Sequence, residues 1–261
     1  MSLELPEADR TPLQASPLEL VVCQVRFEET LGVADGRIAL AIHDDLGGKA
    51  GLFQRIEPAK STQVEILAGS APVIRSGWRF TSEDQSWIAT VMPDAASLET
   101  LAYGTWEDFS GPLVQLMQSV QKHVAPALEQ RLGLRYVNRL TRPEVEEARG
   151  WQGHVAPELL GPILHPLLGP SVLSSQQQIE LDVGDGVRCL LRHGALSDPG
   201  RAGLYSYVID IDVFRQGAEP FDSEGIEQAA HGFNDLALRI FHQTVTPELI
   251  AMLREPEGAT A

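Results

Sequence analysis

The sequence predicts an α+β protein in which two similar halves share one core. Several short segments alternate apolar and polar residues with the two-residue period of β-strands. One long segment of each half repeats apolar residues at helical spacing. These segments follow one order in both halves: a strand, an excursion, three antiparallel strands and a long helix. Grouped strands followed by a helix are typical of an α+β fold rather than of a parallel α/β sheet.

We expect a loose leader over residues 1–16, a first half over residues 17–132 and a second half over residues 133–261, the two halves forming one compact unit. The leader is rich in proline and acidic residues. The first half begins with a strand over residues 20–27. Its other expected elements are a short helix near residues 37–45 and strands at residues 63–67, 77–81 and 86–92.

The long helix of the first half is expected to begin near Thr105, where acidic residues follow a capping residue. Pro112 fits an early helical position. Apolar residues at helical spacing continue to Leu128, with Pro126 expected to kink or split the helix and Gly133 expected to stop it.

The second half repeats this plan. Its first strand spans residues 134–140, and a loop with a short helix near residues 157–168 follows. The three strands are expected at residues 178–183, 187–193 and 205–214. Asp222 and Thr246 then precede a long helix and a short final helix as N-capping residues.

The three strands of the second half have one core face and one charged face. The outer face carries acidic, basic and acidic rows on successive strands, which favours cross-strand ion pairs. We therefore expect Arg188 and Arg192 to lie beside acidic side chains, and His193 to point to the opposite face. The acidic neighbours on this face are Glu180, Asp182, Asp210 and Asp212.

The composition excludes several classes of protein. The formal net charge of −16 over 261 residues repels nucleic-acid backbones, so no nucleic-acid partner is expected. No apolar stretch reaches the ~18 residues of a membrane span, and residues 1–30 lack a secretory pattern. Cys23 and Cys189 fall on predicted core faces, where thiols are inert. We expect a cytoplasmic protein without a cofactor.

Two groups of residues have the composition of a metal site. Asp210 and Asp212 share a strand face, an arrangement that can bind a cation or divide acid and base roles. Cross-strand ion pairs on the charged sheet face would explain the same two aspartates without a catalytic or metal-binding role. His231, Asp235 and His242 lie near one side of a predicted helix but lack a further ligand, so boundary histidines beside a core stripe are the favoured interpretation.

The strongest candidate anion site is formed by Arg135 and Arg139, which share a face of the strand at residues 134–140. Two guanidinium groups could grip a carboxylate or phosphate. The alternative, which we favour, is that acidic residues of the protein itself neutralise them. Tyr136 and Asn138 are expected on the opposite face, although asparagine is unfavourable in a strand.

Several segments resemble an uncharacterised, sporadically distributed bacterial protein family of similar length. The most recognisable is GLRYVNRL (residues 133–140), and others are PLELVVCQVRF (residues 17–27), WRF (residues 78–80) and LETLAYGTWEDF (residues 98–109). The resemblance spans nearly the whole chain and ends in residues 233–253. It implies one coherent unit and no particular activity, because the family has no assigned function.

The sequence therefore favours a non-enzymatic binding or interaction module with an unknown protein or small-molecule partner. No nucleophile or phosphate-loop motif is present. A related alternative is a small-molecule-binding protein with a cleft between the halves, lined by aromatic residues. The second alternative is a metal-dependent hydrolase or nuclease that uses Asp210 and Asp212. The aromatic residues expected at the cleft are Trp78, Trp87, Tyr103 and Trp106.

Overall fold

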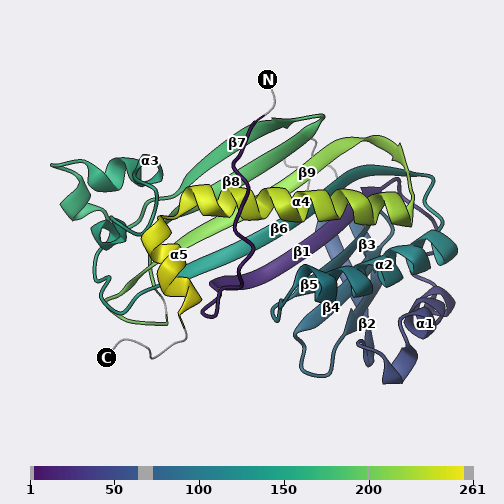
Figure 1. The fold of residues 1–261 in the computed structure, drawn as a ribbon. Helices are drawn as coiled ribbons and strands as arrows, with labels where there is room; N and C mark the ends of the chain where they lie inside the picture. Colours follow the sequence, from purple (N-terminus) through teal and green to yellow (C-terminus); the bar gives the residue numbers. More distant parts are fainter. Residues whose placement is uncertain (1–2, 64–72, 199, 256–261) are drawn as a thin grey trace. The chain divides into compact units, whose positions relative to one another are not determined.

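The computed structural model describes residues 3–63, 73–198 and 200–255, and the predicted α+β fold is confirmed (Figure 1). Over these residues the chain forms five α-helices and one antiparallel sheet of nine strands. The strand order is β2-β3-β4-β5-β1-β6-β9-β8-β7. Strands that are neighbours in sequence are mostly neighbours in the sheet, as short antiparallel connections require.

The elements have the following bounds. The strands are β1 (Leu18–Phe27), β2 (Arg55–Gln63), β3 (Val73–Thr81), β4 (Trp87–Met92), β5 (Ala95–Thr100), β6 (Leu128–Thr141), β7 (Gln177–Gly184), β8 (Val187–Ser197) and β9 (Tyr205–Pro220). The helices are α1 (Gly36–Asp45), α2 (Trp106–His123), α3 (Pro157–Leu160), α4 (Ser223–Thr244) and α5 (Pro247–Arg254).

The chain divides into two compact units that are not contiguous in sequence. Unit 1 contains Met1–Glu19, Arg135–Val213 and Phe233–Ala261, and unit 2 contains Leu20–Leu134 and Phe214–Gly232. Strands β6 and β9 and helix α4 each contribute residues to both units. Each unit is described separately below.

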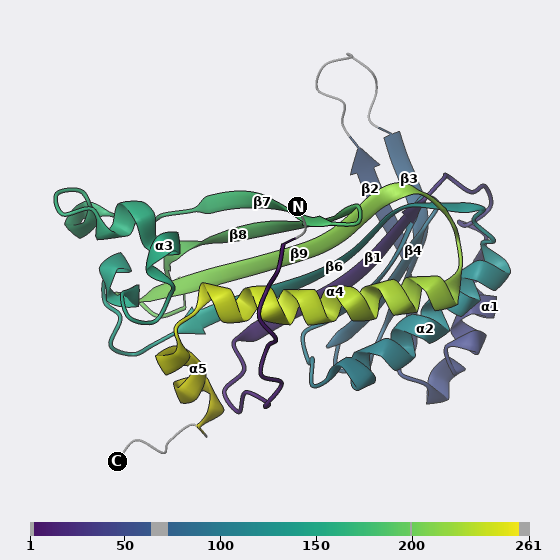
Figure 2. The same cartoon turned by 45° about the horizontal axis from the view of Figure 1, so that its top comes forward.

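In unit 2, α2 packs on one face of the antiparallel strands β1, β5 and β4 (Figure 2). Cys23 of β1 lies opposite Leu98 of β5, and both are fully buried. Phe109 and Leu113 of α2 are also fully buried. The alternation of β1 predicted this core face correctly, because only every second residue of a strand can point toward the helix.

Helix α2 begins as the sequence predicts but ends earlier. Thr105 is the N-cap, and its side chain and that of Asp108 form a reciprocal capping box. The helix ends at His123, Ala125 adopts a left-handed φ of 51°, and Leu128 already belongs to β6. The predicted continuation of the helix to Leu128 is wrong, because Pro126 cannot continue the helical hydrogen bonding.

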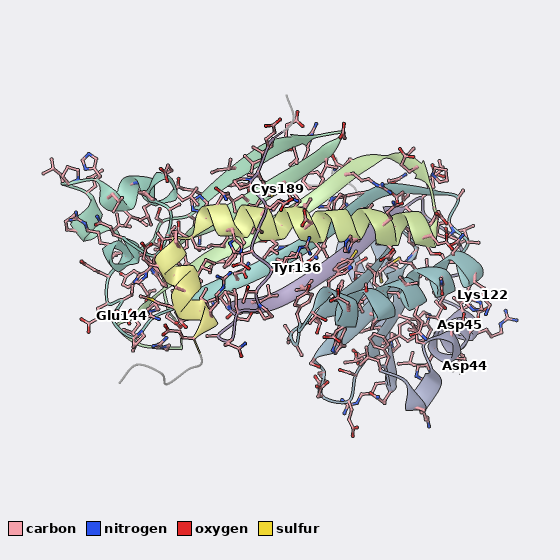
Figure 3. All side chains as sticks on the ribbon, in the orientation of Figure 1. Asp44, Asp45, Lys122, Tyr136, Glu144 and Cys189 are labelled. Carbon is pink, nitrogen blue, oxygen red and sulfur yellow. The ribbon has the colours of Figure 1, made fainter. Side chains whose placement is uncertain are left out.

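The contact between α1 and α2 is centred on Asp45, which lies at the end of the confirmed short helix. The carboxylate of Asp45 accepts hydrogen bonds from Lys122 Nζ at 2.9 Å and Ser119 Oγ at 3.1 Å, and lies 2.8 Å from His123 Nε2. Asp45 and Lys122 are both labelled in Figure 3. The ammonium group of Lys122 lowers the pKa of Asp45 below its ordinary value.

Two strands of unit 2 were not predicted correctly from the sequence. The first is β5 (Ala95–Thr100), which pairs with both β1 and β4, so four strands rather than three lie between α1 and α2. The second is β2, of which the expected strand at residues 63–67 includes Gln63 alone, because residues 64–67 lie outside the described part. Alanine-rich β5 and proline-containing β2 have low strand propensity, and pairing with neighbours overrides it.

In unit 1, the C-terminal part of α4 and helix α5 lie on one face of strands β6, β9, β8 and β7 (Figures 1 and 2). The side chain of Thr246 caps α5 as predicted, accepting a hydrogen bond from Leu249 N. The predicted leader has no regular secondary structure in its described part, but it contacts helices α4 and α5. Arg10 pairs with Asp235 of α4, and Ala15 N donates to Leu253 O of α5 at 3.0 Å.

The excursion, defined here as residues 142–176, connects β6 to β7 within unit 1. The helix expected near residues 157–168 is present only as α3 followed by a 3-10 turn over Gly161–Leu164. Pro162 and Gly169 interrupt a longer helix, since proline lacks a backbone donor. At Gly169 a side chain would overlap the Ile163 carbonyl oxygen, so only glycine permits this close backbone packing.

Candidate functional site

The outer face of the unit 1 sheet holds Asp210 between two arginines. Asp210 is only 7% exposed at its side chain. Its two oxygens accept hydrogen bonds from Arg135 Nε and NH2, each at 2.7 Å, and Arg192 NH1 donates to the second oxygen at 3.3 Å. The hydrogen bonds to Asp210 raise the pKa of Arg135, and Asp212 acts on it electrostatically in the same direction. Asp210 is therefore a structural counter-ion.

The other arginines of this face also have acidic partners. Arg139 Nε donates to Glu19 at 2.7 Å, and Arg188 NH1 donates to Glu180 at 3.1 Å. The predicted outer position of Arg188 and Arg192 is confirmed, as is the internal acidic partner that we favoured for Arg135 and Arg139. The bidentate geometry at Arg135 is the strong form of a guanidinium–carboxylate interaction.

The opposite face of β6 explains why an asparagine, which is unfavourable in a strand, occurs there. Tyr136 and Asn138 are both buried there, as predicted. Tyr136 OH donates to Asn234 Oδ1 of α4 at 2.7 Å, and Asn138 Nδ2 donates to the Ile209 carbonyl oxygen at 3.3 Å (Figure 3 labels Tyr136). An asparagine that is unfavourable by propensity is thus retained for a hydrogen bond across the strands.

The aromatic residues proposed for a cleft all belong to unit 2, where they are not gathered in one place. Trp87, Tyr103 and Trp106 surround Phe109, with ring centroids 5.9, 6.0 and 6.0 Å from its own. Trp78 instead donates its Nε1 hydrogen to Val33 O at 3.0 Å. Three of the four aromatic residues therefore form one cluster around Phe109 in unit 2, of which Trp106 is buried and Trp87 and Tyr103 are half-buried.

The helical grouping of His231, Asp235 and His242 has other partners. Asp235 forms an ion pair with Arg239, in which Oδ2 lies 2.7 Å from Nε, and the His231 ring lies 5.7 Å from that of Trp106. No group of three metal-ligating side chains is found in the part of the chain that the structure describes. Cys23 and Cys189 are buried as predicted, and burial raises the pKa of both thiols to about 12.

An apolar surface on the excursion was not identified from the sequence. The side chains of Leu167, Leu168 and Leu173 are 82%, 61% and 77% exposed within seven positions of the chain. They lie in an uncharged stretch, defined here as residues 159–179, between Glu158 and Glu180, without any Asp, Glu, Lys or Arg. The lack of charge over this length in a strongly acidic chain is the sequence signal that could have revealed this surface.

Comparison with known proteins does not supply a family: no protein-family model and no curated protein matches the chain. The resemblance to the uncharacterised bacterial family stays a prediction. Among the described residues, no helix is both long enough and apolar enough to cross a membrane.

Proposed function

We propose that the chain is a non-enzymatic interaction module that binds a protein partner through the uncharged stretch of unit 1. The observation that carries this proposal is the exposure of Leu167, Leu168 and Leu173 on one short surface segment. Single exposed leucines are common on soluble proteins, but grouped ones with no intervening charge mark interaction surfaces.

The edge of the sheet next to this stretch supports the proposal. Strand β7 follows the leucines directly and is the terminal strand of the sheet order, with neither proline nor lysine in its sequence. The other terminal strand, β2, carries Pro58 and Lys60, residues that discourage pairing with a further strand. An extended segment of a partner could thus pair with β7 while its apolar side chains cover the leucines. The Leu3 N–H already donates to Val183 O at 3.2 Å and so occupies one acceptor of β7.

The charge of the chain limits the choice of partner. At a net charge of −16, two copies of this protein repel each other, as do the protein and an anionic membrane. Glu180 and Asp182 are exposed on β7 beside the apolar stretch. We infer that the partner is a different protein with an apolar contact surface and basic or neutral flanks.

The hydrolase alternative receives less support. Both oxygens of Asp210 already accept hydrogen bonds from guanidinium groups, so a metal or substrate would first have to displace Arg135 and Arg192. Removing a carboxylate from such a pair costs several kcal/mol in a buried site. The small-molecule alternative, with its cleft between the halves, also receives less support, because Trp87, Tyr103 and Trp106 gather around Phe109 within unit 2.

Site-specific photo-cross-linking in the source cells tests the proposal. Benzoylphenylalanine is placed at Leu173 in one variant and at Leu31 in another. Leu31 is a matched control because it is 90% exposed but belongs to unit 2 and lies outside the uncharged stretch. We expect a discrete adduct with another protein from position 173 and none of that mass from position 31.

Three outcomes would contradict the proposal. The same adducts from positions 173 and 31 would mean that exposure alone determines what is captured. An adduct of twice the mass of the chain would make the partner a second copy, against the charge argument. The absence of any adduct at 173 would remove the uncharged stretch as an interaction surface.

A further inference from the structure

Four aromatic rings form a connected series on the core side of unit 1. His193 of β8 stacks on Tyr207 of β9, with ring centroids 6.1 Å apart. The ring centroid of Tyr207 lies 5.8 Å from that of Trp151, which lies 5.9 Å from that of His154. Trp151 and His154 belong to the excursion. His193, Tyr207 and Trp151 are almost completely buried. The series therefore joins the sheet to the excursion above it.

Only part of the hydrogen-bonding capacity of these rings is used. His193 Nδ1 lies 2.8 Å from Tyr207 OH, and that hydroxyl lies 3.4 Å from the Leu159 carbonyl oxygen. Trp151 Nε1, His154 Nδ1 and His193 Nε2 are buried and have no hydrogen-bond partner among the described residues. Three ring nitrogens of one connected series are therefore left unpaired.

Such an arrangement is costly without an occupant. A buried donor or acceptor that loses its partner destabilises a protein by about 1–3 kcal/mol. More than ~90% of buried polar groups in folded proteins have a partner, which can be a water or a ligand. The other unpaired buried atoms of the described residues lie on non-aromatic side chains, whereas these three lie on rings that are connected in succession through Tyr207 and Trp151. We infer that this ring series, consisting of His193, Tyr207, Trp151 and His154, is a binding site for a small organic ligand.

The chemistry of the unpaired atoms defines the ligand class. Indole Nε1 can only donate, so the ligand must present an acceptor oxygen to Trp151. Burial lowers the pKa of His193. The pKa of His154 is also lowered, mainly by burial and to a smaller extent by the positive charge of Arg142. Both imidazoles are therefore neutral near pH 7. A neutral imidazole offers one donor or one acceptor at the free nitrogen. A carbonyl or carboxylate compound meets these requirements, and it needs no metal ion.

The direction of donation between His193 Nδ1 and Tyr207 OH, 2.8 Å apart, sets the role of His193 Nε2. If the hydroxyl donates to the Leu159 carbonyl oxygen at 3.4 Å, Nδ1 donates to the hydroxyl and Nε2 is an acceptor, which selects a ligand that also donates, as an amide does. If the hydroxyl donates to Nδ1, Nε2 is a second donor beside Trp151 Nε1, which selects a ligand with two acceptor oxygens, as a carboxylate has. This site does not depend on the proposed protein interaction, because its rings are buried whereas the leucines are exposed.

Indole ¹⁵N–¹H NMR spectra of the whole protein test this inference. The protein is titrated with acetate and, separately, with acetamide, which has the same shape without the charge. We expect the Trp151 indole resonance to shift saturably with at least one of them, with a millimolar dissociation constant suited to so few atoms. The Trp78 resonance is the internal control and should stay in place, because its Nε1 already donates to Val33 O.

The outcomes separate the ligand site from a hydrated one. Saturation by acetate alone identifies an anionic ligand, and saturation by acetamide identifies a neutral carbonyl ligand. A Trp151 resonance that responds to neither compound up to about 100 mM overturns the inference and leaves water as the partner of these nitrogens. The resonance is assigned with Trp151→Phe, or by elimination with Trp78→Phe, Trp87→Phe and Trp106→Phe if that variant does not fold.

Discussion

The two faces of the unit 1 sheet differ in how completely their polar side chains are hydrogen-bonded. On the outer face, Asp210 is surrounded by donors from two arginines. On the inner face, His193 follows Arg192 directly in sequence, yet its Nε2 has no partner among the described residues. The charged groups of the outer face are paired with one another, whereas among the described residues of the inner face Tyr136 and Asn138 have partners but His193 Nε2 does not.

This difference shows that charge density alone does not identify a site. A row of arginines on an acidic protein suggests an anion-binding site in the sequence, but neighbouring strands supply carboxylates that neutralise these arginines. Unpaired ring nitrogens such as that of Trp151 carry no charge and are inconspicuous in the sequence. Their burial without a partner is nevertheless the stronger indication that something else binds there.

The largest effect is expected from Asp210→Ala, which removes the shared counter-ion of Arg135 and Arg192. We expect the free energy of unfolding to fall by about 3 kcal/mol, near the lower limit for breaking a buried pair, because both arginines are partly exposed. Urea denaturation measures this change. Glu180→Gln on the same face is the matched control, and since its pair with Arg188 is exposed, it should change stability by less than about 0.5 kcal/mol. Equal effects of the two substitutions would mean that the outer face is not organised around Asp210.

A smaller effect is expected from the double substitution Arg135→Ala/Arg139→Ala. Asp210 would keep only Arg192, and Glu19 would lose its partner, so stability should fall by about 2 kcal/mol without any ligand present. Thermal unfolding of the purified variant measures this loss. An unchanged melting temperature, together with lost stabilisation by added phosphate, would instead restore the anion-site hypothesis.

The smallest effect concerns the inner face and depends on pH. Because burial lowers the pKa of His193, the unfolded chain takes up a proton at higher pH than the folded chain does. Stability is thus fully present above pH ~6.5 and is lost as the pH falls toward the pKa of the folded state, by at most about 1.4 kcal/mol per pH unit. The variant His193→Asn should lose less stability between pH 7.5 and pH 5.5 in the same unfolding assay. Identical acid sensitivity of both proteins would show that His193 is not a source of it.

Much of the fold was predictable from the sequence because its causes are local. Alternation in β8 and β9 identified both faces of the sheet, and Asp222 and Thr246 marked the starts of α4 and α5. The side chain of Asp222 accepts a hydrogen bond from Gly225 N at 2.8 Å, as an N-cap should. Strand β5 was missed because it is stabilised by pairing on both sides, which the sequence of a single segment does not reveal.

The sites were less predictable because they depend on contacts between distant segments. The partner of Arg135 lies 75 positions away, and Tyr207 meets Trp151 only through the path of the excursion. The exposure of Leu167, Leu168 and Leu173 was also hidden, since leucines at this spacing suggest a buried helix face. Proline and glycine shorten that helix and leave these side chains in solvent.

The central claim is that unit 1 binds a protein partner through the uncharged stretch and not through its charged face. The most direct measurement is the affinity of the protein cross-linked at position 173 for two variants of the chain. Leu167→Ser/Leu173→Ser alters the stretch, and Arg139→Gln alters the outer face. We predict that the leucine variant binds at least about tenfold more weakly, a loss of about 1.4 kcal/mol, while Arg139→Gln binds like the unmodified chain. Loss of binding in Arg139→Gln with full affinity in the leucine variant would contradict the claim.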